Sequence, residues 1–410
     1  MSGRIPTGPP DSAVSRQHEI YRVCEARSSE FSAVNTILAA AIILTMSTSV
    51  WLVFRWGHLR CEGTEPLPLL TFLAILFTSG LDVGLIMFPL VDFQTYEAGA
   101  DYGFSNPLAI EFGFWGFLVW GFYFLTTFYF CIVEPRLKLF ELPWIKHINN
   151  GVIIGTCAFT AYLFLVYLPD YIEGISEPVR FGLVAMVVLL AVISSTHLRF
   201  IRVLSVTSTG LFFTLIVGAW LLSGMGWGGL GGSLVALGDY FPNLPRFVLP
   251  INDYHAFYLF WWFAWSIMIG QFVSRFVGGI KAWQLLLALL VVPSIPIAVW
   301  FSVLYHYHVE GTDIVPALSW GMIAVGILFV INSLDSLTRL YTQNINLTVA
   351  RLGTVSYIGL HWTLLFGLVL LYQFTPFKIE WVGLVVIAIY LTIFYRVWRK
   401  RDELSLPQQV

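Results

Sequence analysis

Long apolar stretches separated by short polar segments run along almost the whole chain. Eleven of them are long enough to cross a bilayer as helices, because about 20 apolar residues span the hydrocarbon core. They lie at residues 34–55, 69–92, 107–133, 149–168, 179–197, 205–225, 254–274, 282–305, 314–338, 355–374 and 379–397. The polar first 33 residues have no apolar core and so do not form a signal peptide. The pattern predicts an all-α polytopic membrane protein with about 11 transmembrane helices.

Composition narrows the function classes. Of the 410 residues 58% are hydrophobic and 11% are charged, and the net charge of −2 argues against nucleic acid as a partner. The four cysteines have neither metal-ligand spacing nor a disulfide framework. No metal-ligand cluster or nucleophile–base pair stands out. We therefore expect no enzyme and no cofactor, and we expect the lipid bilayer as the surroundings.

Lysine and arginine divide unequally between the two sets of loops. One set holds Arg55, Arg60, Arg136, Lys138, Lys146, Arg199, Arg202, Arg275, Lys281, Arg339, Arg351, Arg396, Arg399, Lys400 and Arg401. The other holds Arg4, Arg16, Arg22, Arg27, Arg180, Arg246 and Lys378. Because cytoplasmic loops carry the excess of positive charge, the C-terminus is predicted inside and the N-terminus outside. The expected location is the cell (inner) membrane, with many passes.

One predicted span contains an acid between glycines. Asp82 lies mid-span, flanked by Gly80 and Gly84, and Pro89 follows. Glycines loosen a helix, so its carbonyl groups can turn toward an ion, and a carboxylate there can bind a cation or carry a proton. The alternative is a glycine pair used for packing, with Asp82 paired to a neighbouring helix. The cost of an unpaired acid in hydrocarbon favours the functional interpretation.

A second span is interrupted by small polar residues. Asn332, Ser333, Asp335 and Ser336 lie within the otherwise apolar predicted span 314–338. Side chains of this kind also form ordinary hydrogen bonds between membrane helices. This stretch alone leaves both interpretations open.

Aromatic residues gather on one face of each of two predicted helices. With about 100° between successive residues of a helix, each group of three shares a face. The groups are Trp115, Trp120 and Tyr123, and Trp261, Trp262 and Trp265. Facing each other, the rings would form an aromatic cage that attracts a quaternary ammonium group. The alternative is two aromatic stripes packed as core.

Several segments resemble the betaine/choline/carnitine transporter family over about residues 34–397. The segments are FYLFWWFAWSIMIGQFVSRFVGG (257–279), the WxxxxWxxY spacing from Trp115 to Tyr123, FVINSLDS (329–336), LGDY (237–240) and VVPSIPIAVWFSV (291–303). The first of these resembles the signature span of the family and is the most specific. The others are specific mainly through their order.

The resemblance implies a LeuT-type fold with two inverted repeats of five helices. The repeats are expected at 69–197 and 254–374, joined by a helix and an external loop at 205–253. A polar segment, 1–33, and an extra helix, 34–55, precede them, and the last helix with a short cytoplasmic tail occupies 379–410. Family members usually have twelve spans, and the missing one corresponds to the first. The family also implies a homotrimer.

The resemblance assigns the solute to the aromatic residues. Trp115, Trp120, Tyr123 and Trp262 are expected to hold the onium group, with Trp261 and Trp265 along the pathway. The glycine motif of the family reads GxGxG, and Asp82 replaces its middle glycine here. Asp82 is therefore expected either to balance a cationic solute or to carry a coupling proton.

The resemblance also places a coupling ion, Na⁺ or H⁺. Backbone oxygens near Thr78, Leu81 and Phe329 and the side chains of Asn332 and Ser333 form the implied sodium site. Asn332 replaces a threonine of the family, but an amide oxygen can still ligate sodium.

The function expected from these features is ion-coupled secondary transport of a quaternary-ammonium or related methylated-onium solute, of the choline or betaine type, by alternating access. The rival hypothesis is a relative that no longer transports and acts as a sensor or as a structural subunit of a larger membrane complex. The intact cage motif favours transport, whereas the missing first span favours the rival.

Overall fold

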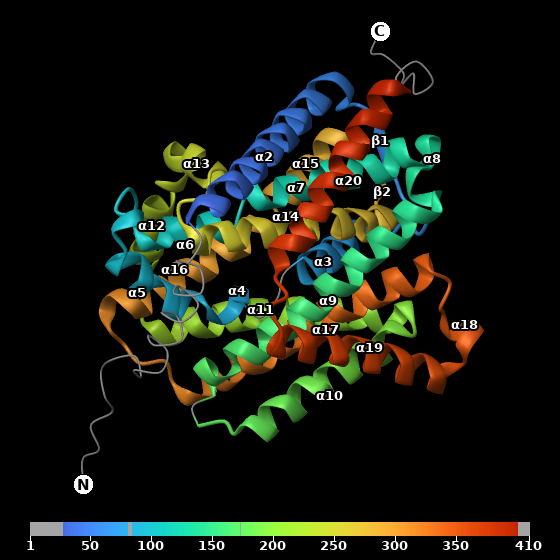
Figure 1. The fold of residues 1–410 in the computed structure, drawn as a ribbon. Helices are drawn as coiled ribbons and strands as arrows, with labels where there is room; N and C mark the ends of the chain where they lie inside the picture. The colour runs from blue at the N-terminus through green and yellow to red at the C-terminus, as the bar shows by residue number, and fades with distance from the viewer. Residues whose placement is uncertain (1–27, 81–83, 173, 401–410) are drawn as a thin grey trace.

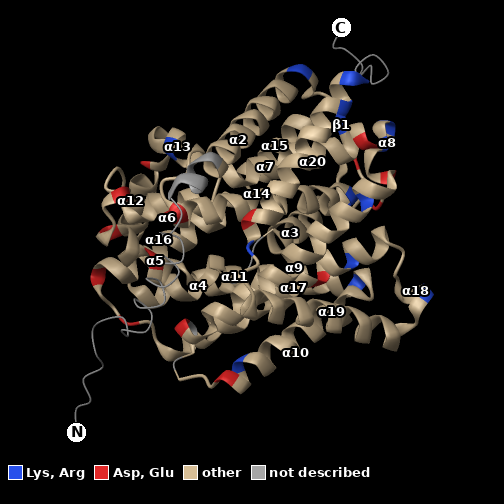
Figure 2. Ribbon diagram, in the orientation of Figure 1, with Lys and Arg blue, Asp and Glu red and all other residues tan. Residues whose placement is uncertain are grey.

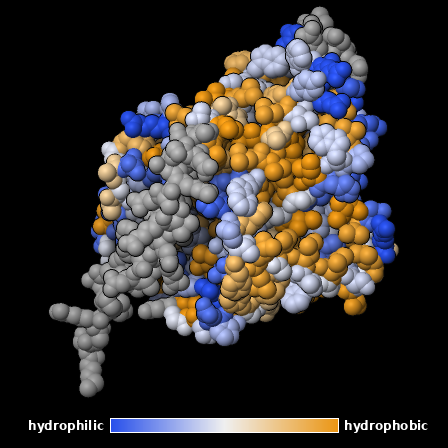
Figure 3. All heavy atoms as spheres, viewed as in Figure 1, coloured by the Kyte–Doolittle hydropathy of each residue, from blue (hydrophilic) through white to orange (hydrophobic). Residues whose placement is uncertain are grey.

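The computed structural model describes residues 28–80, 84–172 and 174–400. Its described part is almost entirely helical and contains one two-stranded antiparallel sheet, β1 (Arg60–Glu62) with β2 (Gly278–Lys281) (Figure 1). Asp82 and Leu81 lie outside the described residues. Apolar side chains such as Phe54 and Val355 are exposed on the outer helices, and Figure 3 shows hydrophobic residues over much of the described surface. An outer surface of this kind fits lipid as its solvent, and the chain is a multi-pass membrane protein.

Ten helical segments in the described part are long and apolar enough to cross a membrane. They are Val34–Trp56, Pro107–Leu137, Pro143–Asp170, Glu177–Ser195, Leu198–Ser223, Asp253–Phe276, Ala282–Glu310, Pro316–Asn344, Thr354–Phe374 and Ile379–Arg399. Several extend beyond the apolar stretch that predicted them because helical hydrogen bonding continues into the polar ends. The remaining predicted span, 69–92, is not one helix. It consists of α3 (Leu69–Ser79), α4 (Gly84–Met87) and α5 (Pro89–Ala98).

The spans fall into two sets of five that pack in the same way. The first set is α3 to α5, then α6 (Pro107–Trp115) with α7 (Leu118–Phe128), α9 (Pro143–Tyr171), α10 (Glu177–Ser195) and α11 (Leu198–Ser223). The second is α14 (Asp253–Val273), α15 (Ala282–Leu290) with α16 (Ser294–Glu310), α17 (Pro316–Asn344), α19 (Thr354–Phe374) and α20 (Ile379–Arg399). Helix α3 packs on α11 as α14 packs on α20, and α10 packs on α17 as α19 packs on α9. Likewise α11 contacts α17 as α20 contacts α9. Helix α9 also packs on α17, and α10 packs on α19; in each of these two pairs the helices occupy the same position in their own set.

This exchange of partners is what two repeats related by a two-fold axis produce. Five crossings are an odd number, so the second set starts from the opposite side of the membrane and is inverted. The connecting helices, α12 (Trp227–Leu237) and α13 (Tyr240–Val248), have 11 and 9 residues and so reach only about 16 and 14 Å, too short to cross. The expected bounds, 69–197 and 254–374, hold only four spans each. Helices α11 and α20 supply the fifth, and α2 (Ser28–Trp56) lies outside both sets against α7.

Charged residues gather at opposite ends of the spans. Figure 2 shows Lys and Arg around α8 (Glu134–Leu137), β1 and the end of α20, whereas many Asp and Glu lie around α5, α6 and α12. We call these ends the basic face and the acidic face. The basic face corresponds to the loops that the sequence places in the cytoplasm.

Candidate functional site

The aromatic site begins with a break between α6 and α7. Gly116 and Phe117 interrupt the helix, and Phe117 adopts a positive φ of 45°, which is unusual for a bulky residue. The backbone N–H of Phe117 donates to Ser294 Oγ at 2.9 Å, and that of Leu118 donates to the Tyr240 hydroxyl at 3.3 Å. These two side chains satisfy N–H groups that the break releases, as a broken membrane helix requires. Trp115 and Trp120 are thereby placed on either side of the break.

The six predicted cage residues form one continuous buried cluster. Each is at most 2% exposed. The ring centroids are 5.4 Å apart for Trp115–Trp262, 5.9 Å for Trp115–Trp261, 5.3 Å for Trp261–Trp262, 5.4 Å for Trp120–Tyr123, 6.3 Å for Tyr123–Trp262 and 6.3 Å for Trp261–Trp265. The structure therefore brings all six together across α6, α7 and α14.

The rings of the cluster touch one another. Trp115 meets Trp261 and Trp262 nearly at right angles, at 89° and 85°, in the edge-to-face geometry that aromatic rings prefer. A cation held between two rings needs its own space, with each centroid within about 6 Å of the charge. Binding an onium group here requires the rings to separate.

Indole N–H groups tie this cluster to the helix break. The Nε1 groups of Trp262 and Trp120 donate to the carbonyl oxygens of Phe114 and Trp115, at 2.7 and 3.1 Å. Those carbonyls lie in the last turn of α6, where the break removes their helical partners. The buried Nε1 groups of Trp261 and Trp265, by contrast, have no hydrogen-bond partner among the described residues. An unpaired buried donor costs on the order of 1–3 kcal/mol, so these two N–H groups are suited to an acceptor on a bound molecule.

The glycines of the broken helix provide room for the cage rings. A Cβ on Gly80 would lie 3.0 Å from the Trp120 ring, and one on Gly84 would lie 2.6 Å from the Trp115 ring. Both positions therefore admit only glycine without movement of a tryptophan. Asp82 lies between them in the sequence and falls outside the described residues.

An acidic layer lies between the cage and the acidic face. The Tyr254 hydroxyl donates to both carboxylate oxygens of Asp92 at 3.1 Å, and the Tyr96 hydroxyl donates to Glu111 Oε2 at 2.6 Å. Tyr258 joins this layer to the cage, because its ring lies 5.6 Å from that of Trp115. Both carboxylates are buried, and neither forms an ion pair with a Lys, Arg or His of the described chain.

The sequence contained a sign of this layer that the sequence analysis missed. Glu111 is a lone acid within the predicted span 107–133, and an acid at such a position is costly unless it has a role. Its Oε1 atom is buried, and no described residue forms a hydrogen bond with it. Its pairing with Tyr96 of α5 could not be inferred, because it depends on how α5 and α6 pack.

The polar stretch of α17 meets two neighbouring segments at once. The Ser333 hydroxyl donates to the Thr78 carbonyl at 3.5 Å, and the hydroxyls of Ser336 and Ser79 are 2.9 Å apart. Ser194, on α10, donates to Asp335 Oδ2 at 2.5 Å. Helix α17 is thus joined to the end of α3 by hydroxyl groups, just before the part of the broken helix that is not described.

The amide group of Asn332, an expected sodium ligand, is hydrogen-bonded to a neighbouring helix. Its Oδ1 accepts a hydrogen bond from Ser205 at 3.1 Å, and its Nδ2 donates to Ser208 Oγ at 2.7 Å and to the Leu328 carbonyl at 2.9 Å. These serines belong to α11, so the amide faces α11 rather than α3. Phe329 is buried, with its ring 5.9 Å from that of Phe77. Of the expected ion-site residues, Thr78 and Ser333 are joined by a hydrogen bond between α3 and α17.

Comparisons with known proteins agree with these features. The model of the family described as BCCT, betaine/carnitine/choline family transporter, matches residues 153–314. An uncharacterized transporter of Mycobacterium tuberculosis is 21% identical over 61% of this chain and 50% of its own length. A glycine betaine/proline/choline transporter of Vibrio parahaemolyticus is 22% identical over 65% of this chain and 59% of its own. The chain thus spans about half the length of the curated relatives it matches.

A solved structure shows a further similarity. It is the substrate-bound outward-open state of a Na⁺-coupled sialic acid symporter, with 14% identity, a TM-score of 0.46 and coverage of 88% of this chain and 83% of that one. The matched family region includes α14 with its three tryptophans. Residues 153–314 thus resemble the betaine/carnitine/choline transporter family, as do the curated relatives.

Proposed function

We propose that the chain is a secondary transporter that moves a quaternary-ammonium or related methylated-onium solute across the membrane by alternating access. The observation that carries the proposal is the buried cluster of five tryptophans and one tyrosine beside a broken helix. The names of relatives that include glycine betaine and choline support this solute class. The proposed location is the inner membrane of the cell.

The cage recognises the onium group through its rings. A methylated ammonium has no N–H to donate, so it gains little from hydrogen-bond acceptors but binds the negative face of an aromatic ring. Trp115, Trp120, Tyr123 and Trp262 surround the group, with Trp261 and Trp265 alongside. The free N–H groups of Trp261 and Trp265 can donate to a hydroxyl or carboxylate elsewhere in the same solute.

Movement of the broken helix opens the cage. Because the rings are in contact, the solute enters only when they separate, and Gly80 and Gly84 are the points where the broken helix lies closest to them. The acidic layer of Asp92 and Glu111 borders the cage on the side of the acidic face, so the solute passes these two groups when the cage opens to that side. Inverted sets of helices allow the same solute site to open to either side.

A proton or a sodium ion drives transport in this proposal. Asp82 carries the proton or balances a cationic solute. For sodium, the Thr78 carbonyl and the Ser333 hydroxyl are the contacting pair, completed by carbonyls of Leu81 and Phe329. Asn332 joins this site only if it leaves Ser205 and Ser208.

Uptake by proteoliposomes tests the proposal. Radiolabelled choline and glycine betaine are offered to the purified protein with a sodium gradient, with a proton gradient and with neither. We expect one solute to accumulate, with dependence on one gradient. Binding of the solute without uptake under every gradient would contradict transport and support the sensor or structural-subunit hypothesis.

The proposed orientation has its own test, and the homotrimer implied by the family has another. A cysteine at Ser12 should react with an impermeant maleimide in intact cells, and one at Gln408 should not. Equal protection of both positions would contradict an external N-terminus. The mass of the protein in nanodiscs distinguishes a trimer from a monomer.

A further inference from the structure

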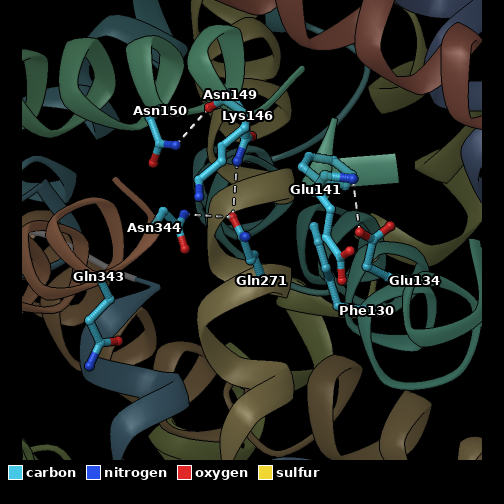
Figure 4. A pocket seen from close by; sticks show the side chains of 10 residues that line it. Phe130, Glu134, Glu141, Lys146, Asn149, Asn150, Gln271, Gln343 and Asn344 are labelled. Carbon is cyan, nitrogen blue, oxygen red and sulfur yellow. Dashed lines mark hydrogen bonds between the residues drawn. The ribbon is translucent and has the colours of Figure 1, made fainter. Parts of the chain in front are cut away.

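A cavity of about 330 Å³ lies at the basic face, where helix α9 begins and helices α14 and α17 end (Figure 4). It is closed on its other side by the π-helical turn η2 (Tyr129–Val133), by α8 and by η3 (Leu139–Glu141). Its volume falls within the range of small-molecule sites, about 300–1,000 Å³. Gln271 lines it and follows Trp262 by nine residues on α14, about 13 Å along the axis. The cavity is therefore separate from the aromatic cage.

One half of the cavity is lined by amides and a lysine. Gln271 Oε1 accepts from Asn149 at 3.0 Å and from Asn344 at 3.4 Å, so its own NH₂ group is left to donate elsewhere. Figure 4 shows Lys146 on the same side of the cavity as these amides. Lys146 forms no ion pair with a described acid. This half therefore offers one positive charge and neutral amide donors, which suit a carboxylate.

An arginine behind the cavity fixes the direction of two further amides. The Arg275 guanidinium donates to the carbonyl oxygens of Gln343 and of Asn344, the latter at 3.1 Å. Their carbonyls are thereby occupied, and the NH₂ group of Gln343 remains. Within the described part of the chain, the buried carbonyl oxygens of Asn149 and Asn150 have no hydrogen-bond partner. Each of these oxygens needs a donor, which water can supply.

The other half of the cavity combines aromatic rings with acids. The rings of Phe130 and Phe140 lie 4.9 Å apart at 56°, and Glu134 and Glu141 line the cavity beside them. The Glu134 carboxylate is held by the Tyr129 hydroxyl at 2.7 Å and by two backbone N–H groups of η3. A π-face next to carboxylates attracts an onium group. Figure 4 shows this half opposite the amides.

We propose that this cavity is a second solute site, complementary to a zwitterion that carries both an onium group and a carboxylate. Lys146 and Gln271 bind the carboxylate, and Phe130, Phe140 and Glu141 bind the onium group. The inference rests on the proposed function, because it assumes an onium solute that travels between the cage and the basic face. A solute such as choline lacks the carboxylate and leaves the lysine half unused, so the cavity favours the betaine type.

Equilibrium binding of radiolabelled glycine betaine to the purified full chain tests the second site. The wild type should bind two equivalents per chain in two affinity classes, and Trp262→Leu should leave the cavity class intact. Adding Lys146→Met to Trp262→Leu should weaken that class by about tenfold or more, through loss of a charge-assisted hydrogen bond. Lys146→Arg should retain it. Lys378→Met, at an exposed lysine outside the cavity, is the matched control. Choline should bind in a single affinity class, the one assigned to the aromatic cage.

The possible failures are distinguishable. A single class that disappears in Trp262→Leu would overturn the cavity site and leave the cage intact as the transport site. A second class that neither Lys146→Met nor Phe130→Leu weakens would also overturn it, because both halves of the cavity are then uninvolved. Unchanged affinity of the first class in Trp262→Leu would instead contradict the cage and, with it, the proposed function.

Discussion

The first helices of the two repeats occupy equivalent places and are built in opposite ways. The segment α3 to α5 is interrupted by glycine and proline, whereas α14 runs unbroken from Asp253 to Val273. At its break the first segment presents backbone and small hydroxyls, such as Thr78 and Ser79, to α17. Helix α14 presents tryptophan rings to α6 and α7. The same position in a repeat can thus serve either an ion, through released carbonyls, or an onium group, through π-faces.

Although α14 is unbroken, its packing on α7 also depends on a glycine. A Cβ on Gly270 would lie 2.1 Å from Thr126 Oγ1 and 2.8 Å from the Thr126 backbone carbon. Thr126, on α7, donates to the Ser266 carbonyl at 2.7 Å across the same contact. Close approach of α14 to α7 is therefore what brings the two aromatic faces together. A backbone atom cannot move aside as a flexible side chain can.

The largest effect is expected for Gly270→Ala. The added methyl group collides with backbone, so α14 and α7 must separate, and we expect a loss of about 3 kcal/mol or more in stability with loss of onium binding. Thermal unfolding of the purified protein in detergent measures the loss of stability. Gly367→Ala, on α19, places its Cβ in open space and should change the midpoint little. Equal midpoints for the two variants would show that the contact between α14 and α7 is not close.

The next effect is expected for Trp262→Leu, which removes one π-face and keeps an apolar side chain. Loss of one cation–π partner in a dry site should cost about 2 kcal/mol, or about thirtyfold in onium affinity. Tryptophan fluorescence or calorimetry measures the affinity. Trp227→Leu, at an exposed tryptophan, is the control. Unchanged onium affinity in Trp262→Leu would remove the cage assignment and the contrast between the two first helices.

Substitutions of Asp82 test the role of the broken helix in solute selectivity and in proton coupling. Asp82→Gly restores the glycine motif of the family and Asp82→Asn removes only the charge, so both should weaken choline relative to glycine betaine by about tenfold, or about 1.4 kcal/mol. Asp82→Gly should also flatten the pH dependence of uptake if Asp82 carries the proton. Competition between the two solutes in proteoliposomes gives the ratio. A ratio and a pH profile equal to those of the wild type in both variants would make Asp82 a structural residue.

The smallest effects are expected for substitutions of Asn332 and Ser333, and they distinguish the roles of these two residues. Asn332→Ala removes the acceptor of Ser205 and a donor to Ser208, and should cost about 1 kcal/mol in stability, without change in sodium dependence. Ser333→Ala should instead weaken any sodium dependence, because its hydroxyl contacts the Thr78 carbonyl. Uptake at varied sodium concentration and thermal unfolding are measured for both. Loss of sodium dependence in Asn332→Ala at unchanged stability would place Asn332 in the ion site.

The sequence by itself determined the class of this protein and much of its cage. Apolar runs of membrane length are a local property, and ten of the eleven predicted spans correspond to long helices. The two aromatic faces also follow from helical periodicity, and the structure joins their residues, for example Trp115 with Trp262. The glycines around Asp82 correctly indicated that span 69–92 is not a single helix.

Tertiary structure decided whatever depends on partners far apart in the chain. Helices α11 and α20 complete the repeats because of what they pack against, and no local pattern distinguishes them from extra helices. Glu111 meets Tyr96, and Asn332 meets Ser205, because packing brings their helices together. The direction of a buried polar side chain is set by which neighbour can satisfy its hydrogen bonds, since water cannot do so in hydrocarbon. Sequence periodicity assigns a residue to a helix face, but the neighbouring helices determine what that face contacts.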